Sequence, residues 1–323
     1  MREHLIYEYK HKLYYKIELK YIKKFNSRLP RVMTNRGIRF INRDSFNESV
    51  YNWIVSGKSF MVARLGETEC ATIYQGFLAE NGYLPDISEK RKEMICNNAG
   101  FFPKESKKIQ EYVDLMKNVI NNADILGFWE TEGQEEIIDA FGSYSLRLTN
   151  IDNLHPYDYI PKRRGKVWTS ALKGKKVLVI HPFADTICEQ YKKRKAIWNN
   201  EDILPEFELK TIKAVQTIAG QTDERFKDWF EALDYMYKEA LKIDFDIAII
   251  ACGAYGICLA SMLKDAGKQA FHWGGIMQLW FGIKGKRWDN NPKWQQYFNE
   301  SWVRPSLSET PTNNVKIEDG CYW

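Results

Sequence analysis

The chain has 323 residues, a mass of 38.0 kDa and a formal net charge of +5. Hydrophobic residues make up 44% and charged residues 28%, which is ordinary for a folded chain and excludes wholesale disorder. No apolar run reaches the roughly 18 residues needed to cross a bilayer, and the N-terminal residues are too charged for a signal peptide. We therefore expect a cytoplasmic protein. Its six cysteines include no CxxC pair, which predicts reduced thiols rather than a zinc knuckle.

The N-terminal residues 1–43 form a basic arm with six Lys, six Arg and three Glu, whereas the rest of the chain is net acidic. Apolar and aromatic residues recur in it near helical spacing, and lysines fill much of the remainder. This pattern is typical of an amphipathic helix that lies on the anionic inner face of a membrane. A helix docked on the body with a solvated lysine face fits equally well. Nucleic acid is disfavoured as a partner because no reader motif accompanies the charge.

Beyond the arm, short apolar runs typical of buried strands alternate with helical stretches. The predicted strands are 59–65, 124–129, 176–182, 245–252 and 269–272. The predicted helices are 45–55, 104–121, 184–196 and 223–242. Such alternation predicts an α/β protein with a Rossmann-like, mostly parallel sheet flanked by helices. We expect one domain over residues 44–300 and a loosely structured tail over 301–323.

The first predicted strand, 59–65, contains Arg64 near its end, and Gly66, Glu67 and Glu69 follow it. If this segment is extended, the alternate side chains of the two glutamates share a face and converge on one point. Two carboxylates at the end of a strand suit Mg²⁺ or Mn²⁺, which can bridge a diphosphate. The alternative is that both glutamates begin the next helix, where they meet the positive end of its dipole.

The strand 245–252 leads into Gly253, Tyr255 and Gly256 at the start of another helix. Backbone N–H groups at a helix N-terminus bind anions, and glycines let a phosphate approach. A nicotinamide cofactor is disfavoured because the full dinucleotide signature and its acidic residue are missing. A glycine turn that serves only packing is the alternative.

Two histidines, His181 and His272, stand at strand ends, and Asp185 follows the first of them. Such a histidine can bind a phosphate or ribose or act as a base, although a structural role is at least as common. Further on, Arg287 lies in a cluster of three cations beside a tryptophan and is a candidate to neutralise a departing diphosphate. A solvated surface turn would explain this cluster equally well.

Four segments, in matching order over about residues 45–290, resemble the GT-D-type glycosyltransferases. The segments are Arg64-Leu-Gly-Glu67-Thr-Glu69, Asn97-Asn-Ala-Gly-Phe-Phe-Pro103, Ala251-Cys-Gly-Ala-Tyr-Gly256 and His272-Trp-Gly-Gly275 through Trp288. The resemblance implies a Rossmann-like fold, a UDP-hexose donor (UDP-glucose or UDP-galactose), a divalent metal held at a D-x-E motif, and a role in bacterial surface glycan synthesis. The sequence departs from the family's pattern at Glu67, where the family often has Asp.

These observations lead to the hypothesis of a cytoplasmic, peripherally membrane-bound glycosyltransferase that extends a glycan on a lipid carrier. Glu67 and Glu69 would hold Mn²⁺ or Mg²⁺, and Glu69 or Asp185 would deprotonate the acceptor hydroxyl in an inverting reaction. The residues expected to bind the donor are Arg64, Gly66, Asn97, His181, Gly253, Tyr255, Gly256, His272, Gly275 and Arg287. The alternatives are a catalytically silent scaffold that recruits polysaccharide enzymes to the membrane, and another nucleotide-dependent α/β enzyme.

Overall fold

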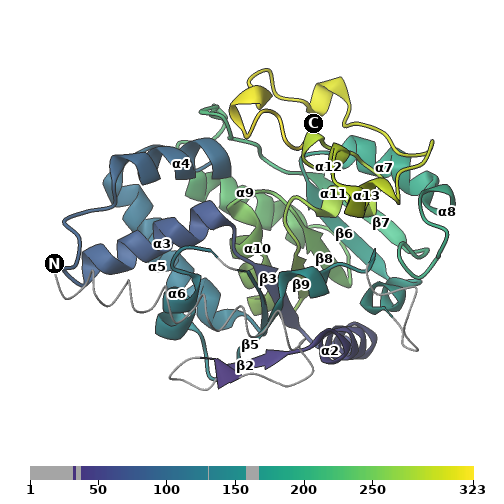
Figure 1. Ribbon diagram of the computed structural model, residues 1–323, viewed down its shortest axis with the longest axis horizontal. Helices are drawn as coiled ribbons and strands as arrows, with labels where there is room; N and C mark the ends of the chain where they lie inside the picture. The colour runs from purple at the N-terminus through teal and green to yellow at the C-terminus, as the bar shows by residue number, and fades with distance from the viewer. Residues whose placement is uncertain (1–31, 34–37, 130, 158–166) are drawn as a thin grey trace.

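A computed structural model of the chain describes residues 32–33, 38–129, 131–157 and 167–323, so the predicted helix of the basic arm lies outside the described residues. Within them, one nine-stranded sheet runs through the molecule (Figure 1). Its strands are β1 (Val32–Met33), β2 (Ile38–Ile41), β3 (Phe60–Arg64), β4 (Ile125–Phe128), β5 (Arg147–Asn150), β6 (Lys176–His181), β7 (Glu208–Lys213), β8 (Ile247–Ile250) and β9 (Gln269–His272).

The strands follow the spatial order β1-β2-β5-β4-β3-β9-β8-β6-β7. All neighbouring pairs are parallel except β1 and β2, which are antiparallel. The two halves of the chain meet where β3 lies beside β9, with Val62 paired to Phe271. The prediction of a Rossmann-like α/β fold with a mostly parallel sheet is therefore confirmed. Because parallel strands end at the same edge, the segments that follow β3, β6, β8 and β9 come together there.

Successive side chains of the central strands enter two separate hydrophobic cores, one on each face of the sheet. In β3, Met61 and Ala63 join one core while Phe60 and Val62 join the other. All four are fully buried, because helices cover both faces. This explains why the strand reads as a continuous apolar run instead of an alternating one.

Helices on the first face contribute side chains to the core of Met61 and Ala63. They are α3 (Glu67–Glu80), α4 (Glu89–Ala99), α5 (Ser106–Asn122), α6 (Gln134–Phe141), α9 (Trp229–Leu241) and α10 (Tyr255–Asp265). Helices and helical turns on the second face contribute side chains to the core that contains Phe60 and Val62. They are α2 (Arg43–Ser56), η1 (Ile151–Leu154), η3 (Trp168–Leu172), α7 (Ala184–Lys192), α8 (Arg194–Ile197), α11 (Met277–Trp280), α12 (Lys286–Asp289) and α13 (Pro292–Gln295).

Local signals place several helix ends. The Asn42 side chain accepts the N–H of Ser45 and starts α2, and Gly57, at φ 73°, ends it in the left-handed conformation that glycine adopts freely. The predicted helix 184–196 is instead divided into α7 and α8, and the predicted helix 223–242 begins only at Trp229. In α9 the Asp228 side chain accepts the N–H of Glu231, which fixes that start.

Residues 301–323 contain only the short turns η4 (Leu307–Glu309) and η5 (Asn314–Lys316), yet they pack against the body. The carboxylate of buried Glu309 accepts the N–H groups of Asp185 at 2.8 Å and Thr186 at 3.2 Å. This contact fastens the segment to the start of α7, above the carboxyl edge of the sheet (Figure 1).

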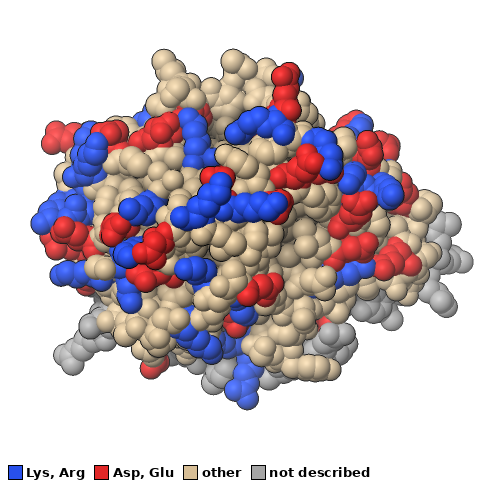
Figure 2. All heavy atoms as spheres, turned by 180° about the vertical axis from the view of Figure 1, so that it is seen from behind, with Lys and Arg blue, Asp and Glu red and all other residues tan. Residues whose placement is uncertain are grey.

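On the face shown in Figure 2, basic and acidic side chains of the described residues are interspersed, so that face presents no extended field of one sign. None of the helices in the described part of the chain combines the length and the apolar character needed to span a bilayer.

Candidate functional site

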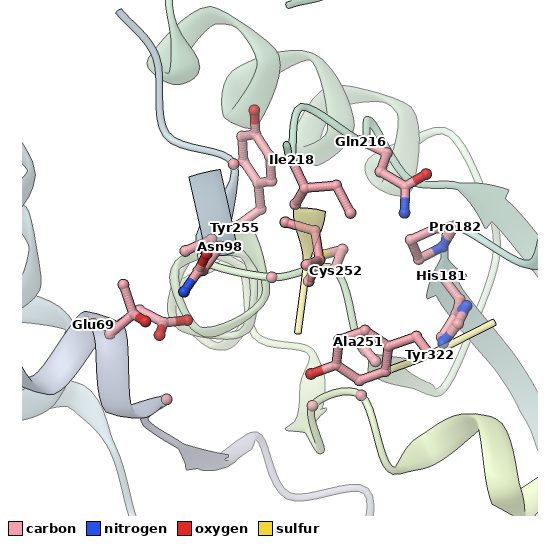
Figure 3. A pocket seen from close by; sticks show the side chains of 18 of the residues that line it. Glu69, Asn98, His181, Pro182, Gln216, Ile218, Ala251, Cys252, Tyr255 and Tyr322 are labelled. Atoms are coloured by element: carbon pink, nitrogen blue, oxygen red, sulfur yellow. The ribbon is translucent and has the colours of Figure 1, made fainter. Parts of the chain in front are cut away.

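A cavity of about 550 Å³ lies at the carboxyl ends of β3, β6, β8 and β9. Its volume falls in the range of sites that enclose a small ligand, about 300–1,000 Å³. Figure 3 shows side chains from distant parts of the chain around it, among them Glu69, Asn98, Gln216 and Tyr322. The cavity therefore occupies the edge where the sequence predicts a ligand site.

The β3–α3 corner brings both predicted carboxylates to this cavity. Glu67 and Glu69 line it, together with Arg64 and Gly66. The helix α3 begins at Glu67, so the prediction of an extended segment with both glutamates on one face is wrong, and the alternative, in which both glutamates begin the next helix, is confirmed. They lie in its first turn, about 200° apart around the axis. Both glutamates nevertheless reach the cavity, because the first turn of α3 forms part of the cavity wall.

Gly66 leaves room for the Glu69 carboxylate, which folds back over it. A Cβ on Gly66 would lie 2.2 Å from Glu69 Oε2 and 2.8 Å from its Cδ. Desolvation by burial raises the pKa of Glu69, and the nearby Arg64 guanidinium opposes that rise. Glu67, by contrast, is exposed. Burial therefore makes the Glu69 carboxylate easier to protonate than an ordinary glutamate.

Arg64 lies between this corner and the end of β9. Its guanidinium lies against Gly274, where a Cβ would come within 2.3 Å of Nε, and its Cζ lies 5.9 Å from the ring centre of Trp129. Arg64 Nε is buried without a hydrogen-bond partner among the described residues. A buried donor of a charged group without a partner costs free energy, which an anionic ligand at this point would recover.

A second corner joins β8 to α10. Gly253 adopts φ 60°, and a Cβ there would lie 3.0 Å from the carbonyl oxygen of Ala99, so this residue must be glycine for both reasons. The hydroxyl groups of Tyr255 and Thr217 lie 2.9 Å apart, and Thr217 also donates to the carbonyl of Gly100. This buried network fixes the start of α10 against the loop after β7.

Both predicted histidines are buried at the cavity, and burial lowers the pKa of each to about 3. They are therefore neutral at physiological pH. The Nδ1 of His181 accepts the N–H of Phe183 at 2.9 Å, so its ring carries the proton on Nε2. The His272 ring packs on Gly256, where a Cβ would lie 2.4 Å from Cδ2. Gly256 itself does not line the cavity, but it makes room for the histidine that does.

Arg287 lines the cavity, but a carboxylate already neutralises it. Its Nη2 binds Glu318, and its Nη1 donates to the hydroxyl of Tyr322 at 3.2 Å. The Tyr322 ring lies 4.7 Å from the guanidinium carbon and packs on Gly275. The only regular structure in residues 301–323 is two short turns, yet this segment forms part of the cavity wall.

A family model described as GT-D-like, a GT-D fold-like domain, matches residues 42–280, which is most of the chain. The chain belongs to the GT-D-like family. This confirms the resemblance carried by the strand-end motifs and gives the domain a fold of glycosyltransferase type. No curated protein and no solved structure matches the chain. The residues of the GT-D-like match supply the corners at α3 and α10, whereas Arg287, Glu318 and Tyr322 lie beyond it.

Most of the predicted site residues of this GT-D-like chain meet at the cavity. Those that line it are Arg64, Gly66, Glu67, Glu69, His181, Gly253, Tyr255, His272, Gly275 and Arg287. Asn97 does not; its neighbour Asn98 does, while the carbonyl of Asn97 accepts the N–H of Ala219. Asp185 is also absent from the lining: it is exposed, and its carboxylate pairs with Lys213 at 3.0 Å. This position gives Asp185 no access to a ligand in the cavity.

The lining residues that were not predicted from the sequence include Asn98, Gln216, Thr217, Glu318 and Tyr322. Asn98 stood next to a predicted residue, within a segment that resembles the family. Gln216 and Thr217 follow β7, which was not predicted. No local pattern singles out the other two, because their place at the cavity depends on contacts made by the whole segment 301–323.

Proposed function

We propose that this chain is a glycosyltransferase that moves a hexose from a UDP-sugar to a glycan acceptor. The observation that carries the proposal is one cavity, at the carboxyl edge of a GT-D-like sheet, that two carboxylates and the start of α10 line together. A donor of this kind carries a nucleoside, a diphosphate and a sugar, and each of these groups needs different contacts from the residues that line the cavity.

The diphosphate fits best at the start of α10. No side chain caps this helix. The N–H of Gly256 already donates to the carbonyl of Gly253 at 3.1 Å, so an anion would meet the positive end of the helix dipole and the remaining N–H groups. Gly253 lets the phosphate approach closely, and the buried Arg64 Nε supplies a charged donor across the cavity. At the other end, the amide of Gln216 and the side chain of Ile218 point into the cavity (Figure 3) and offer polar and apolar contacts to the nucleoside.

Glu67 and Glu69 fit a divalent cation that arrives with the donor. Among the described residues, no group of three or more His, Cys, Asp or Glu side chains is placed to hold a metal ion. Mg²⁺ is typically bound by one or two carboxylates together with substrate phosphates, and Mn²⁺ accepts the same oxygen ligands. Without a cation, two carboxylates would repel the diphosphate. When bound there, Mn²⁺ or Mg²⁺ would stabilise the charge that develops on the leaving UDP.

The proposal is tested by calorimetry with UDP and Mn²⁺ and by UDP release from a panel of UDP-sugars. Glu69→Gln should lose the metal-dependent heat and most of the turnover. It should remain folded, because the raised pKa of Glu69 means that its ionised form destabilises the folded chain at neutral pH. Asp185→Asn is the matched control: it removes a carboxylate outside the cavity and should behave as the wild type. A wild-type chain without metal-dependent heat would instead favour the scaffold alternative.

We also propose that the basic arm, residues 1–43, holds the enzyme on an anionic membrane where a lipid-linked acceptor of a bacterial surface glycan is presented. The concentration of positive charge in the arm supports this proposal. Full-length protein should sediment with vesicles that contain anionic lipid, and less so as salt screens the attraction. A full-length variant with the six lysines of the arm changed to Gln should lose this binding. Equal binding of the two proteins would contradict the role of the arm.

A further inference from the structure

The cavity of this chain is completed by a C-terminal wall formed by Ile317, Glu318, Tyr322 and Trp323, which lies outside the GT-D-like match. The wall is held by the backbone at several points. The N–H of Arg287 donates to the carbonyl of Cys321 at 2.9 Å, and Gln278 Nε2 donates to that of Tyr322 at 3.0 Å. It is therefore a fixed part of the site.

A chain of contacts places this wall next to the position proposed for the diphosphate. Arg64 lies against Gly274, and the next residue, Gly275, lies against the Tyr322 ring, where a Cβ would come within 2.3 Å of Cε1. The group joined to the distal phosphate of a nucleotide sugar is the sugar itself. A ligand whose diphosphate contacts Arg64 would thus bring its sugar against Tyr322.

The chemistry of the wall suits an uncharged sugar. The Tyr322 ring offers an apolar face with a hydroxyl at its edge, which matches a hexose with its carbon face and its ring of hydroxyl groups. The carboxylate of Glu318 accepts hydrogen bonds from sugar hydroxyls and repels a carboxylate. Arg287, the cation that could have attracted an acidic sugar, is already paired with Glu318.

We propose that the C-terminal wall is the subsite for the transferred sugar, and that its Arg287–Glu318 pair selects uncharged hexoses over uronic acids. This inference rests on the proposed function and assigns its specificity to residues that the family match does not include. Selection here is the difference between the affinities for a neutral hexose and for a uronic acid. Glu318 repels the carboxylate of the uronic acid, so removing the charge of Glu318 should change the preference.

The test compares the calorimetric Kd values of UDP, UDP-glucose and UDP-glucuronate in the presence of Mn²⁺. Glu318→Gln leaves Arg287 without its partner, and the affinity for UDP-glucuronate relative to UDP-glucose should rise roughly fivefold, a modest factor because the pair is partly exposed. The affinity for UDP should stay unchanged. Glu206→Gln breaks a similar pair with Arg194 away from the cavity and should change none of the three.

Tyr322→Leu gives a second measurement that does not depend on charge: it should weaken UDP-glucose binding and leave UDP binding unchanged. An unaltered UDP-glucuronate preference in Glu318→Gln overturns the inference alone, as does a loss of UDP affinity in Tyr322→Leu equal to that for UDP-glucose. A change confined to the KM for the glycan acceptor in these two variants also overturns the inference, because the C-terminal wall would then bind the acceptor. A wild-type chain that binds none of the three ligands overturns the proposed function, and this inference with it.

Discussion

The position of the Glu69 carboxylate over Gly66 can be tested with Gly66→Ala. Gly66 has φ −76° and ψ 161°, a conformation that alanine adopts without strain. Its new Cβ would lie 2.2 Å from Glu69 Oε2, whereas ordinary contacts begin near 3.4 Å, so the carboxylate must move by about 1 Å. Oxygen ligands of Mg²⁺ and Mn²⁺ must stay within about 0.2 Å of their proper distance.

We therefore expect Gly66→Ala to weaken Mn²⁺-dependent UDP binding at least tenfold, the lower end of what disturbed surroundings of a metal ligand cost. Stability should change by less than about 1 kcal/mol. Alanine is a poorer helix cap than glycine, which lowers the free energy of unfolding. It also reduces the entropy of the unfolded chain, which raises that free energy and offsets the loss. The measurements are calorimetry with UDP at fixed Mn²⁺ and urea unfolding of the same preparations.

Gly76→Ala, in the same helix, is the matched control. Its Cβ would lie 2.7 Å from Val113 Cγ2 in the core, where a branched side chain has no room to turn away. Overpacking of about 1–3 kcal/mol should exceed the helix propensity gained, so this variant should lose stability but keep Mn²⁺-dependent UDP binding. If Gly66→Ala instead binds UDP and Mn²⁺ as the wild type does, Glu69 is not a ligand of the cation.

Three further predictions concern the surroundings of the cavity. Glu309→Gln should lower the free energy of unfolding by about 1–2 kcal/mol in urea, because the buried carboxylate accepts two N–H groups at the start of α7. Tyr255→Phe should cost about 1 kcal/mol by the same measurement: it removes the hydrogen bond with Thr217 and keeps the ring stacked on Trp229. Mn²⁺-dependent UDP binding should weaken on acidification at a pH above the ordinary glutamate range, because burial raises the pKa of Glu69 and its protonation removes a ligand charge. Calorimetric titrations of the wild type from pH 4 to pH 8 should show this step, and a loss of binding only within the ordinary glutamate range would contradict it.

The central strands could be predicted because both faces of the sheet are covered. β3 and β8 are buried at nearly every position, which gives the unbroken apolar runs that the sequence analysis identified. β7 alternates exposed and half-buried side chains at the edge of the sheet, and its sequence, Glu-Leu-Lys-Thr-Ile-Lys, has no such run. α4 has a largely charged sequence, of which only Lys92, Ile95 and Ala99 are buried. Neither element leaves a pattern strong enough to predict from the chain alone.

The site residues that directly follow a buried strand could be predicted from the sequence. Those whose position depends on tertiary contacts could not. Arg64, Glu69 and Gly253 each follow a buried strand, and parallel strands place such segments at one edge. Asp185 also follows a strand, but the neighbouring strand ends in Lys213, whose ammonium pairs with the carboxylate away from the cavity. That pairing could not be predicted because β7 itself was not.

The N-termini of the helices that begin at the cavity give its two sides different electrostatic character. The first N–H groups of α7 already bind the carboxylate of Glu309, and the start of α3 is crowded by Glu69. Of the helices α3, α7 and α10, which begin at the cavity, α10 has an N-terminus that no side chain caps and no acidic residue in its first turn. A cation is accordingly favoured at the α3 side and an anion at the α10 side, with the Arg64 guanidinium between them. This arrangement agrees with the proposed positions of the metal and the diphosphate, and with the proposal that the sugar binds at the C-terminal wall.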